Sequence, residues 1–514
     1  MFTGASSTGA LAVRDGRIAA LGEPAVRRLI TGRTEVVRLR GRTLLPGFID
    51  AHAHPVFGGL LGLRCDLTGA VDAADCLRLV GEHRGGEGWL LGGGWDSALF
   101  PGGAPSAAAL DEVTGSRPAY LLNRDHHGAW VNTAALRRAG VDAATPDPPD
   151  GRIERDALGR PTGTLHEGAA DLVGRVLAAP DPGEYRAALL AGQRTLHAHG
   201  VTGWQDAIVG PYLGHADLLE VYRSLDAAGR VSGRVQAALW WDRHRGPEQL
   251  PELLDRRTRG RRFRAEHVKI MVDGVCENRT AAMVHPYLGR RTGGLAHFSP
   301  AGLREAVGAL AEAGFPVHFH AVGDRAVRDA LDAVAAAPAR GLRHQIAHAQ
   351  VVRRADLPRF RELGVIANVQ AAWAVHDAAM TELTLPELGA ERAARQYPFR
   401  SLEEAGALLA GGSDWPVSDP APLVAVHAAV NRCEPDGGPP LLPEQAISLR
   451  AALRAHTSGS AAACGFEREA GSLELGMAAD LALLDRDLFA APRSEIAEAR
   501  VAATFVDGAP VHGG

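Results

Sequence analysis

The sequence predicts an α/β protein: a (β/α)8 TIM barrel with a small β-sandwich domain built from both termini and an α+β subdomain inserted after the first strand. Three observations predict this fold. Both ends of the chain are rich in short strands with Gly and Asp turns. From about residue 185, short apolar runs alternate with Ala-, Arg- and Leu-rich helical stretches, and eight such runs are found when "GFIDAHAH" is included as the first.

The terminal segments read as parts of one small β domain. The segment "ALAVRDGRIAALGE" alternates and turns at Asp15-Gly16, which is a hairpin signal, and "TEVVRLRGRTLLPG" follows as further strand. Near the other end, "GSLELGMAADLALLDRD" and "ARVAATFVDGAPV" have the same character. We therefore expect residues 1–47 and 466–514 to form the small β domain.

The barrel is expected over residues 48–465. After "GFIDAHAH" its strands are "GVTGWQD", "RVQAALWW", "HVKIMVDG", "FPVHFHAVGD", "HQIAHAQ", "GVIANVQ" and "ALLAGGSDWP". Helix-like stretches such as "SPAGLREAVGALAEAG" separate them, as βα units require. The first two strands are about 140 residues apart, which is more than any βα loop needs. We assign residues of about 65–180 to the inserted subdomain.

Composition excludes several classes of function. The net charge of −5 gives no reason to expect nucleic acid or an anionic membrane as a partner, and no apolar run approaches a membrane span. The first residues lack the basic and apolar regions of a secretory signal. The five cysteines are odd in number and form no CxxC pair, which favours free thiols. We expect a cytoplasmic protein with a small-molecule substrate, and consider a homodimer.

Polar residues at the ends of the predicted strands are the candidates for chemistry, because barrel active sites lie at the carboxyl ends of strands. His52 and His54 are two positions apart on one strand, so both imidazoles face one site and suit Zn²⁺ or a similar ion. Each candidate alone has an ordinary explanation as a core or rim histidine, a turn or a helix cap. Together they favour a metal site. The further strand-end candidates are Lys269, His318, His320, His344, His348 and Asp414.

Lys269 is the single lysine among 55 Lys and Arg residues. A guanidinium stays protonated, whereas a buried amine can lose its proton and then act as a nucleophile or be modified. Chance placement is the alternative, but a position at the end of a barrel strand favours a chemical role.

The ordered motifs resemble the amidohydrolase superfamily, and within it the "amidohydrolase 3" or YtcJ-like branch. "PGFIDAHAHP" resembles the opening motif of the superfamily. Later motifs of the branch are similar to "RDHHGAWVNTAAL", "GRPTGTLHEGA", "VKIMVDGVCENRTAAM", "VHFHAVGDRAV", "HQIAHAQVV" and "GGSDWPVSDPAPL". Two departures are the short N-terminus and "DHHG" in place of Asp-Gly-His, which leaves the role of His126 open while His127 matches the histidine of the family.

The resemblance implies one or two divalent metal ions, with zinc first and Mn, Co, Fe or Ni as alternatives. It implies a catalytic carboxylate at Asp414 and, in members with two metals, a CO₂-derived carbamate on the lysine of the fourth strand. An arginine could not form that carbamate, since the reaction needs a neutral amine. The implied metal ligands are His52, His54, Lys269, His320, His348 and Asp414.

The expected reaction is metal-assisted hydrolysis of a non-peptide C–N bond in an amide, an N-formyl compound or a carbamate. Asp414 would accept the proton of the attacking water and pass it to the leaving amine. His348 is either a ligand or a contact of the developing oxyanion. His318, Asp324 and Arg279 are expected around the ligands, with packing or salt bridges as the alternative. The candidates for substrate contact are His127, Asn132, Trp95 and Arg279, with a place in the core as the alternative for the tryptophans at positions 95, 130, 373 and 415.

Other activities would use the same fold. An ester or lactone hydrolase, an isomerase or a lyase could have the same metal site. A non-catalytic scaffold relative would be expected to lose ligands, whereas here every ligand position is filled. A metal-free barrel that binds a sugar or a cofactor would not respond to chelators.

Overall fold

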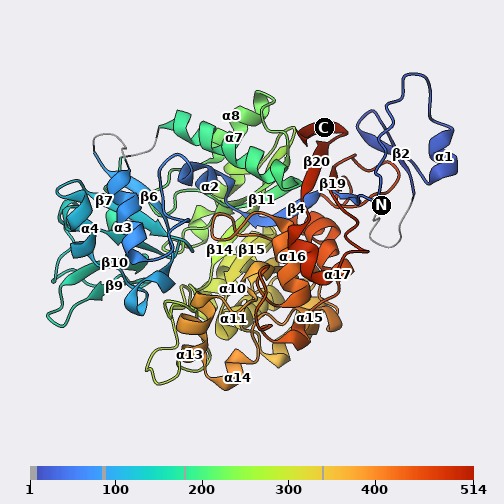
Figure 1. Ribbon diagram of the computed structural model, residues 1–514. Coiled ribbons are helices and arrows are strands. Elements are labelled where there is room, and N and C mark those ends of the chain that lie inside the picture. Colours follow the sequence, from blue (N-terminus) through green and yellow to red (C-terminus); the bar gives the residue numbers. More distant parts are fainter. Residues whose placement is uncertain (1–8, 84–87, 179–180, 339–340, 514) are drawn as a thin grey trace.

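The computed structural model describes residues 9–83, 88–178, 181–338 and 341–513. The expectation about a secretory signal falls partly on residues 1–8, and the expected end of the insert falls on residue 180; these positions lie outside the described residues. Three regions are visible in Figure 1: a central barrel, an insert on the left and a small terminal β region on the right.

Eight parallel strands follow one another around the central region, and each of the eight predicted runs contributes one. The sheet is nearly closed between its first and last strands, where Asp414 N donates to the His52 carbonyl (2.7 Å) and Ser413 N to Asp50 Oδ1 (3.0 Å). The predicted (β/α)8 barrel is therefore confirmed. Its strands are β4 (Phe48–Ala53), β11 (Val201–Val209), β12 (Arg234–Trp240), β14 (Phe263–Met271), β15 (Val317–Ala321), β16 (Gln345–His348), β17 (Ile366–Val369) and β18 (Leu409–Gly411).

Helices connect and cover these strands, and each buries an apolar face against them. In α10 (Pro300–Glu312), Ser299 caps the first turn by accepting from Gly302 N at 3.1 Å, and Leu303, Val307 and Leu310 are buried. Burial of each such side chain contributes about 1.5–3 kcal/mol. The other covering helices are α2 (Pro55–Leu61), α7 (Pro182–Ala198), α8 (Leu219–Ala227), α9 (Leu250–Arg256), α11 (Asp324–Ala336), α12 (Leu357–Leu363), α15 (Phe399–Glu404) and α16 (Pro422–Asn431).

The insert lies between β4 and β11 in the sequence and forms a separate six-stranded mixed sheet in the order β5-β6-β7-β8-β10-β9. Helices α3 (Ala73–Glu82), α4 (Ala107–Thr114) and α5 (Thr133–Ala139) connect its strands. One hydrophobic cluster lies wholly within the insert, and a second also includes Leu213 from the segment after β11. Its strands are β5 (Cys65–Asp66), β6 (Leu90–Trp95), β7 (Ala119–Asn123), β8 (Gly128–Val131), β9 (Gly151–Arg155) and β10 (Pro161–Glu167).

Segments from both ends of the chain share the terminal β region. In the antiparallel sheet β21-β20-β19-β3, β3 (Leu44–Pro46) pairs with β19 (Leu481–Leu484). β20 (Val501–Val506) then pairs with both β19 and β21 (Ala509–Gly513). The hairpin of β1 (Leu11–Arg14) and β2 (Arg17–Leu21) turns at Asp15-Gly16, where both residues have positive φ. The domain limits at residues 47 and 465 stay predictions.

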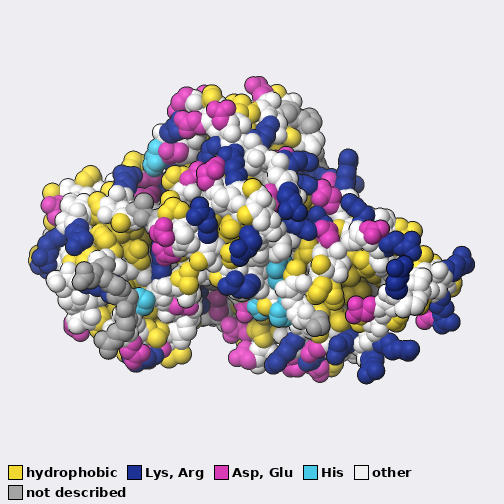
Figure 2. Space-filling view, turned by 90° about the horizontal axis from the view of Figure 1, so that it is seen from above, with side chains coloured by type: hydrophobic (Ala, Val, Ile, Leu, Met, Phe, Trp, Pro, Cys, Tyr) yellow, Lys and Arg dark blue, Asp and Glu magenta, His cyan; other side chains and the backbone are white. Residues whose placement is uncertain are grey.

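The remaining global features concern the surface and the thiols. In the part of the chain that the structure describes, no helix is long and apolar enough to cross a membrane. The five cysteines are free. On the face shown in Figure 2, arginine and acidic side chains are interspersed rather than separated into one basic field.

Candidate metal centre and active site

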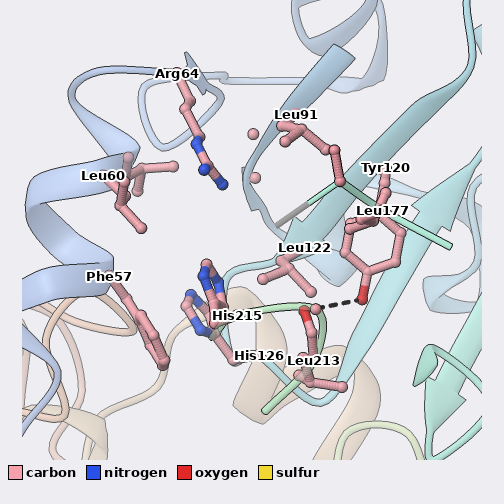
Figure 3. A pocket seen from close by; sticks show the side chains of 15 residues that line it. Phe57, Leu60, Arg64, Leu91, Tyr120, Leu122, His126, Leu177, Leu213 and His215 are labelled. Atoms are coloured by element: carbon pink, nitrogen blue, oxygen red, sulfur yellow. Dashed lines mark hydrogen bonds between the residues drawn. The ribbon is translucent and has the colours of Figure 1, made fainter. Parts of the chain in front are cut away.

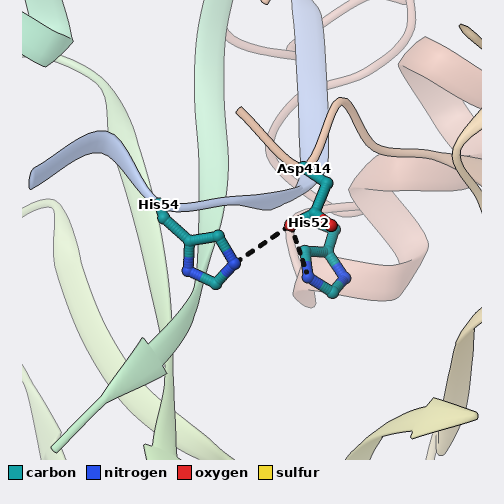
Figure 4. Close-up of side chains that lie close together, drawn as sticks. All are labelled: His52, His54 and Asp414. Carbon is teal, nitrogen blue, oxygen red and sulfur yellow. Dashed lines mark ion pairs between the residues drawn. The ribbon is translucent and has the colours of Figure 1, made fainter. Parts of the chain in front are cut away.

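His52, His54 and Asp414 converge at the carboxyl end of the barrel (Figure 4). Asp414 Oδ1 lies 3.2 Å from His52 Nε2 and 3.0 Å from His54 Nε2, and one ligand atom from each residue falls within 4.8 Å of the others. All three side chains are buried. Two imidazole nitrogens and a carboxylate oxygen at this spacing form a donor set for a divalent ion.

The ends of two neighbouring strands produce this arrangement. His52 lies on β4, and His54 is the N-cap residue of α2 immediately after that strand. Asp414 follows β18 with φ of 59°, a left-handed conformation that the hydrogen bond to the His52 carbonyl supports. The barrel closure therefore places the carboxylate between the two imidazoles.

The protonation states suit metal binding. Burial, together with the charge of Lys269, lowers the pKa of His52 to about 3, so its imidazole is neutral at physiological pH. Burial alone would raise the pKa of Asp414, but His52 and His54 outweigh it and hold that pKa well below its usual range. His54 Nδ1 and His348 Nδ1 are buried nitrogen atoms without a hydrogen-bond partner. Neutral imidazoles and an ionised carboxylate are the states that bind a cation.

Lys269 lies on β14, in register with His318 on β15, and is 1% exposed. Burial lowers the pKa of its amine to about 7, against an opposing effect of Asp414. Its charge also contributes to the lowered pKa of His52 and His348, so the amine lies within electrostatic range of these two candidate ligands. A substantial fraction of this amine is neutral near pH 7.

His320 and His348 complete the histidine cluster. Their ring centroids are 4.4 Å apart, and the His348 ring lies 4.9 Å from that of His52. His320 Nε2 donates to the Gly274 carbonyl at 3.1 Å, which leaves Nδ1 as the nitrogen with a free lone pair. Trp373 stacks on His348 with an interplanar angle of 2°. The structure thus brings together five of the six residues expected to bind metal, and Lys269 lies within electrostatic range of them. Their roles as ligands stay predictions.

The family follows from a sequence profile rather than from the geometry alone. The profile described as "Amidohydrolase family" matches residues 35–512.

The chain belongs to the amidohydrolase family.

Individual relatives agree with this assignment and confirm the resemblance to the YtcJ-like branch. YtcJ of Bacillus subtilis is 28% identical over 98% of this chain and 96% of its own length. The N-substituted formamide deformylase of Arthrobacter pascens is 29% identical over 97% of this chain and 94% of its own. A crystal structure of a metal-dependent hydrolase from Pyrococcus furiosus has a TM-score of 0.71 and 28% identity, covering 93% of this chain and 95% of that one.

A buried chain of amides supports His52 in this amidohydrolase, and sequence reasoning missed most of it. His52 Nδ1 lies 2.9 Å from His318 Nε2, and His318 Nδ1 lies 2.9 Å from Gln205 Nε2. Such partners fix the ring and tautomer of a histidine ligand. His318 was expected around the ligands, whereas buried amides on barrel strands carry no distinctive sequence signal. The chain continues through Gln345, Asn368 and Gln370.

Two buried carboxylates were also missed. Asp273 accepts hydrogen bonds from the backbone N–H groups of Ala282, Val322 and Gly323 and so joins the loops after β14 and β15. Glu167 lies in "GRPTGTLHEGA" at the end of β10 and pairs with His127. That motif was the sequence signal that could have identified Glu167. The rule that active-site residues lie at the carboxyl ends of barrel strands does not apply to residues of the insert.

Two expected substrate contacts require correction, because the structure does not bring Asn132 or Trp95 to the site. Asn132 is fully buried and caps α5: its Oδ1 accepts from Ala119 N and Ala135 N. Trp95 is 1% exposed in the core of the insert, where it packs against Trp130. Of the four tryptophans considered, Trp95 and Trp130 are therefore core residues.

Three residues predicted at or around the strand ends make other contacts. The Arg279 guanidinium lies 3.4 Å from the Glu387 carboxylate, as in the salt-bridge alternative. Asp324 Oδ1 accepts from Val284 N at 2.8 Å. His344 precedes β16 at its amino end, so its placement with the carboxyl-end candidates was wrong.

Proposed function

We propose that this amidohydrolase cleaves a non-peptide C–N bond, with N-substituted formamides as the substrate class. The observation that carries the proposal is the buried convergence of His52, His54 and Asp414 beside the amine of Lys269. The formamide deformylase relative, which matches along nearly the whole chain, supports the choice of substrate.

The residues present fit one or two divalent ions, with zinc as the first choice. A bound ion would lower the pKa of a water molecule and polarise the carbonyl of the substrate. Buried imidazole nitrogens next to an ionised carboxylate are suitable ligands. Within the described residues, His54 Nδ1 and His348 Nδ1 have no hydrogen-bond partner, so the protein itself does not fully use these rings. The residues that would hold the ions are His52, His54, Lys269, His320, His348 and Asp414.

Asp414 is the group that would move the proton. Its carboxylate is ionised, because His52 and His54 outweigh the effect of burial on its pKa. It can therefore accept a proton from the attacking water and pass it to the leaving amine. The protein holds this carboxylate in place through the hydrogen bond between Asp414 N and the His52 carbonyl.

Lys269 would act through its neutral form. A neutral Nζ can attack CO₂, forming an N–C bond and releasing a proton, which leaves a carbamate. A carbamate carries negative charge where an ammonium would repel a cation. The lowered pKa of Lys269 favours this modification.

A panel of substrates tests the proposed reaction. Protein purified without chelator is assayed with N-alkylformamides, simple amides, carbamates, and esters and lactones of matched size, and its metal content is measured by elemental mass spectrometry. We expect formate release from the formamides and at least one ion per chain. The Asp414→Asn variant should lose activity. It also serves as the control for contaminating hydrolases, whose activity would remain in this variant. Cleavage of esters or lactones alone would replace the proposed bond, and absence of metal together with no gain from added Zn²⁺, Mn²⁺ or Co²⁺ would overturn the mechanism.

A further inference from the structure

A pocket lies between helix α2 of the barrel and the sheet of the insert (Figure 3). The enclosed part of the pocket is about 40 Å³, and the wider space of about 550 Å³ between the side chains includes open solvent. Its walls are largely apolar, formed by Leu60, Leu91, Tyr120, Leu122, Leu177 and Leu213. None of these six residues is among the candidate metal ligands.

The Phe57 ring connects this pocket with the metal centre. It stacks on His54, with ring centroids 5.6 Å apart and an interplanar angle of 14°. It also stacks on His215 at 4.3 Å and on His126 at 5.7 Å, and both of these histidines line the pocket. His126 lines the pocket and packs on Phe57, and the charges of His54 and Asp414 also act on its pKa. A substrate at His54 therefore has the pocket beside it.

Arg64 provides the charge of the pocket. Among the lining residues in the described part of the chain, it is the one with a permanent charge, and no acidic residue lines the space. Its Nε donates to Glu184 Oε1 at 2.8 Å, and Figure 3 shows the guanidinium pointing into the space toward His215. The second edge of a guanidinium can bind another carboxylate in a bidentate manner.

The two histidines add polar contacts without adding charge. Burial is the main cause that lowers the pKa of both His126 and His215, and the charge of Arg64 contributes at His215. His215 Nδ1 is buried and has no hydrogen-bond partner among the residues that the structure describes. An apolar space with one fixed cation and neutral polar groups suits a ligand with an apolar body and an anionic end.

We propose that this pocket receives the N-substituent of the substrate, and that it selects an apolar chain or ring of a few carbons that ends in a carboxylate bound by Arg64. This inference rests on the proposed function, since it assigns the part of the substrate beyond the scissile bond. Phe57 would form the wall between the reacting group at His54 and the carboxylate at Arg64.

Direct binding tests the pocket without any reaction. Ligand-observed NMR compares hexanoate with hexanamide, which has the same chain and no charge, on the metal-loaded protein. We expect the wild type to prefer hexanoate and Arg64→Gln to weaken hexanoate binding roughly 10- to 100-fold, as expected for loss of a charge-assisted contact. Hexanamide binding should change little. Hexanoate bound to a metal ion would not respond to Arg64→Gln.

Glu184→Gln is the matched control, because it breaks the same ion pair from the other side. If Arg64 only anchors Glu184, the two variants weaken hexanoate binding equally. If Arg64 binds the ligand, Glu184→Gln frees the guanidinium and leaves hexanoate binding unchanged or tighter. Equal losses of hexanoate affinity in the two variants, or no preference for hexanoate over hexanamide in the wild type, would overturn the proposed role of the pocket.

Kinetics then separate this inference from the proposed reaction. N-formyl-6-aminohexanoate and its primary amide are assayed with wild type and Arg64→Gln, and we expect a roughly 10- to 100-fold loss of kcat/KM, mainly in KM, for the charged substrate alone. If hexanoate binding depends on Arg64 but no formamide is cleaved, the proposed reaction is overturned while the proposed role of the pocket stands. If both formamides are cleaved equally and Arg64→Gln has no effect, the proposed role of the pocket is overturned while the proposed reaction stands.

Discussion

His127 Nδ1 lies 3.0 Å from both carboxylate oxygens of Glu167, although the two residues belong to different strand ends of the insert. The backbone supports the pair, since Glu167 N donates to the His127 carbonyl at 2.8 Å. Thr280 Oγ1, from the loop after β14, donates to Glu167 Oε1 at 2.7 Å. The His127 ring packs 4.9 Å from that of His320, so the pair holds the imidazole of an insert residue against the histidine cluster of the barrel.

Glu167→Gln should therefore impair catalysis without removing the metal. Glutamine keeps the size of the side chain but cannot hold His127 as an imidazolium, so the ring loses both its charge and its fixed orientation. We expect kcat to fall roughly 10- to 100-fold, as for partners that orient active-site histidines, with unchanged metal content by elemental mass spectrometry. A parallel loss of metal would show that Glu167 supports the ligands instead.

The same pair should make the stability of the metal-free protein depend on pH. Burial opposes a charged His127, but Glu167 outweighs it and raises the pKa of His127 to about 9, above its ordinary value of 6.5. The stabilisation from His127 is thus complete below about pH 6.5 and is lost as the pH rises through about 9. Burial would raise the pKa of Glu167, but His127 lowers it to about 2, so its stabilisation is lost only as the pH falls toward that value.

Thermal melting of chelator-treated wild type and Glu167→Gln checks this pH dependence. The difference in Tm should be largest between about pH 4.5 and 6.5, where both groups are charged in the folded state and the stabilisation from each is complete. It should shrink toward pH 9. A difference that stays constant from pH 6 to 9 would contradict the assigned charge of His127.

Lys269 should be the site of a single protein carbamate. Its amine is partly neutral near pH 7, and no other lysine competes for CO₂ in the sequence. In carbon-13-labelled bicarbonate with added metal, NMR should show one lysine carbamate signal in the wild type. Lys269→Arg keeps a cation but cannot form the adduct, so this signal should disappear together with metal and activity. A signal that persists in Lys269→Arg would assign it to the N-terminal amine.

His318 should control metal affinity through His52. Replacing His318 by Phe removes the partner of His52 Nδ1 and leaves a buried nitrogen unpaired. We expect metal affinity, measured by competition with a fluorescent chelator, to fall roughly 10- to 100-fold. His344→Phe is the control: it also removes a buried histidine, but one that accepts from Val317 N at the amino end of β16. Equal effects of the two substitutions would indicate general destabilisation.

The barrel could be predicted because its strands are buried on both faces and therefore read as nearly continuous apolar runs. The rule that barrel sites lie at carboxyl strand ends then predicts that His52, His54 and Asp414 lie together. The same rule misplaced His344. The run "HQIAHAQ" does not reveal that β16 begins at Gln345, directly after its first histidine.

The contacts of the insert could not be predicted in this way. Its sheet is mixed, and β10 rather than β9 pairs with β8. No periodicity in the sequence therefore indicated that Glu167 would contact His127, 40 positions away. Asn132 was expected to contact substrate because its motif resembles one of the family, and Trp95 because it lies near segments assigned to the barrel mouth. In the fold, the Asn132 side chain caps the first turn of α5, and the Trp95 side chain packs in a hydrophobic core of the insert.

Gly274, whose carbonyl accepts from His320 Nε2, gives a steric test of the Glu167 contact. A Cβ added to Gly274 would lie 2.0 Å from Thr280 Oγ1 and 2.2 Å from Glu167 Oε1, so Gly274→Ala must push both groups aside. We expect a loss of about 1–3 kcal/mol in the free energy of unfolding and a loss of activity like that of Glu167→Gln. Gly308→Ala is the opposite control: nothing lies within 4 Å of its added Cβ inside α10, so it should stabilise the protein by about 0.5–1 kcal/mol with unchanged kcat. Urea unfolding and initial rates on the same preparations separate the two effects, and full activity in Gly274→Ala would show that Glu167 and Thr280 can move without consequence for the site.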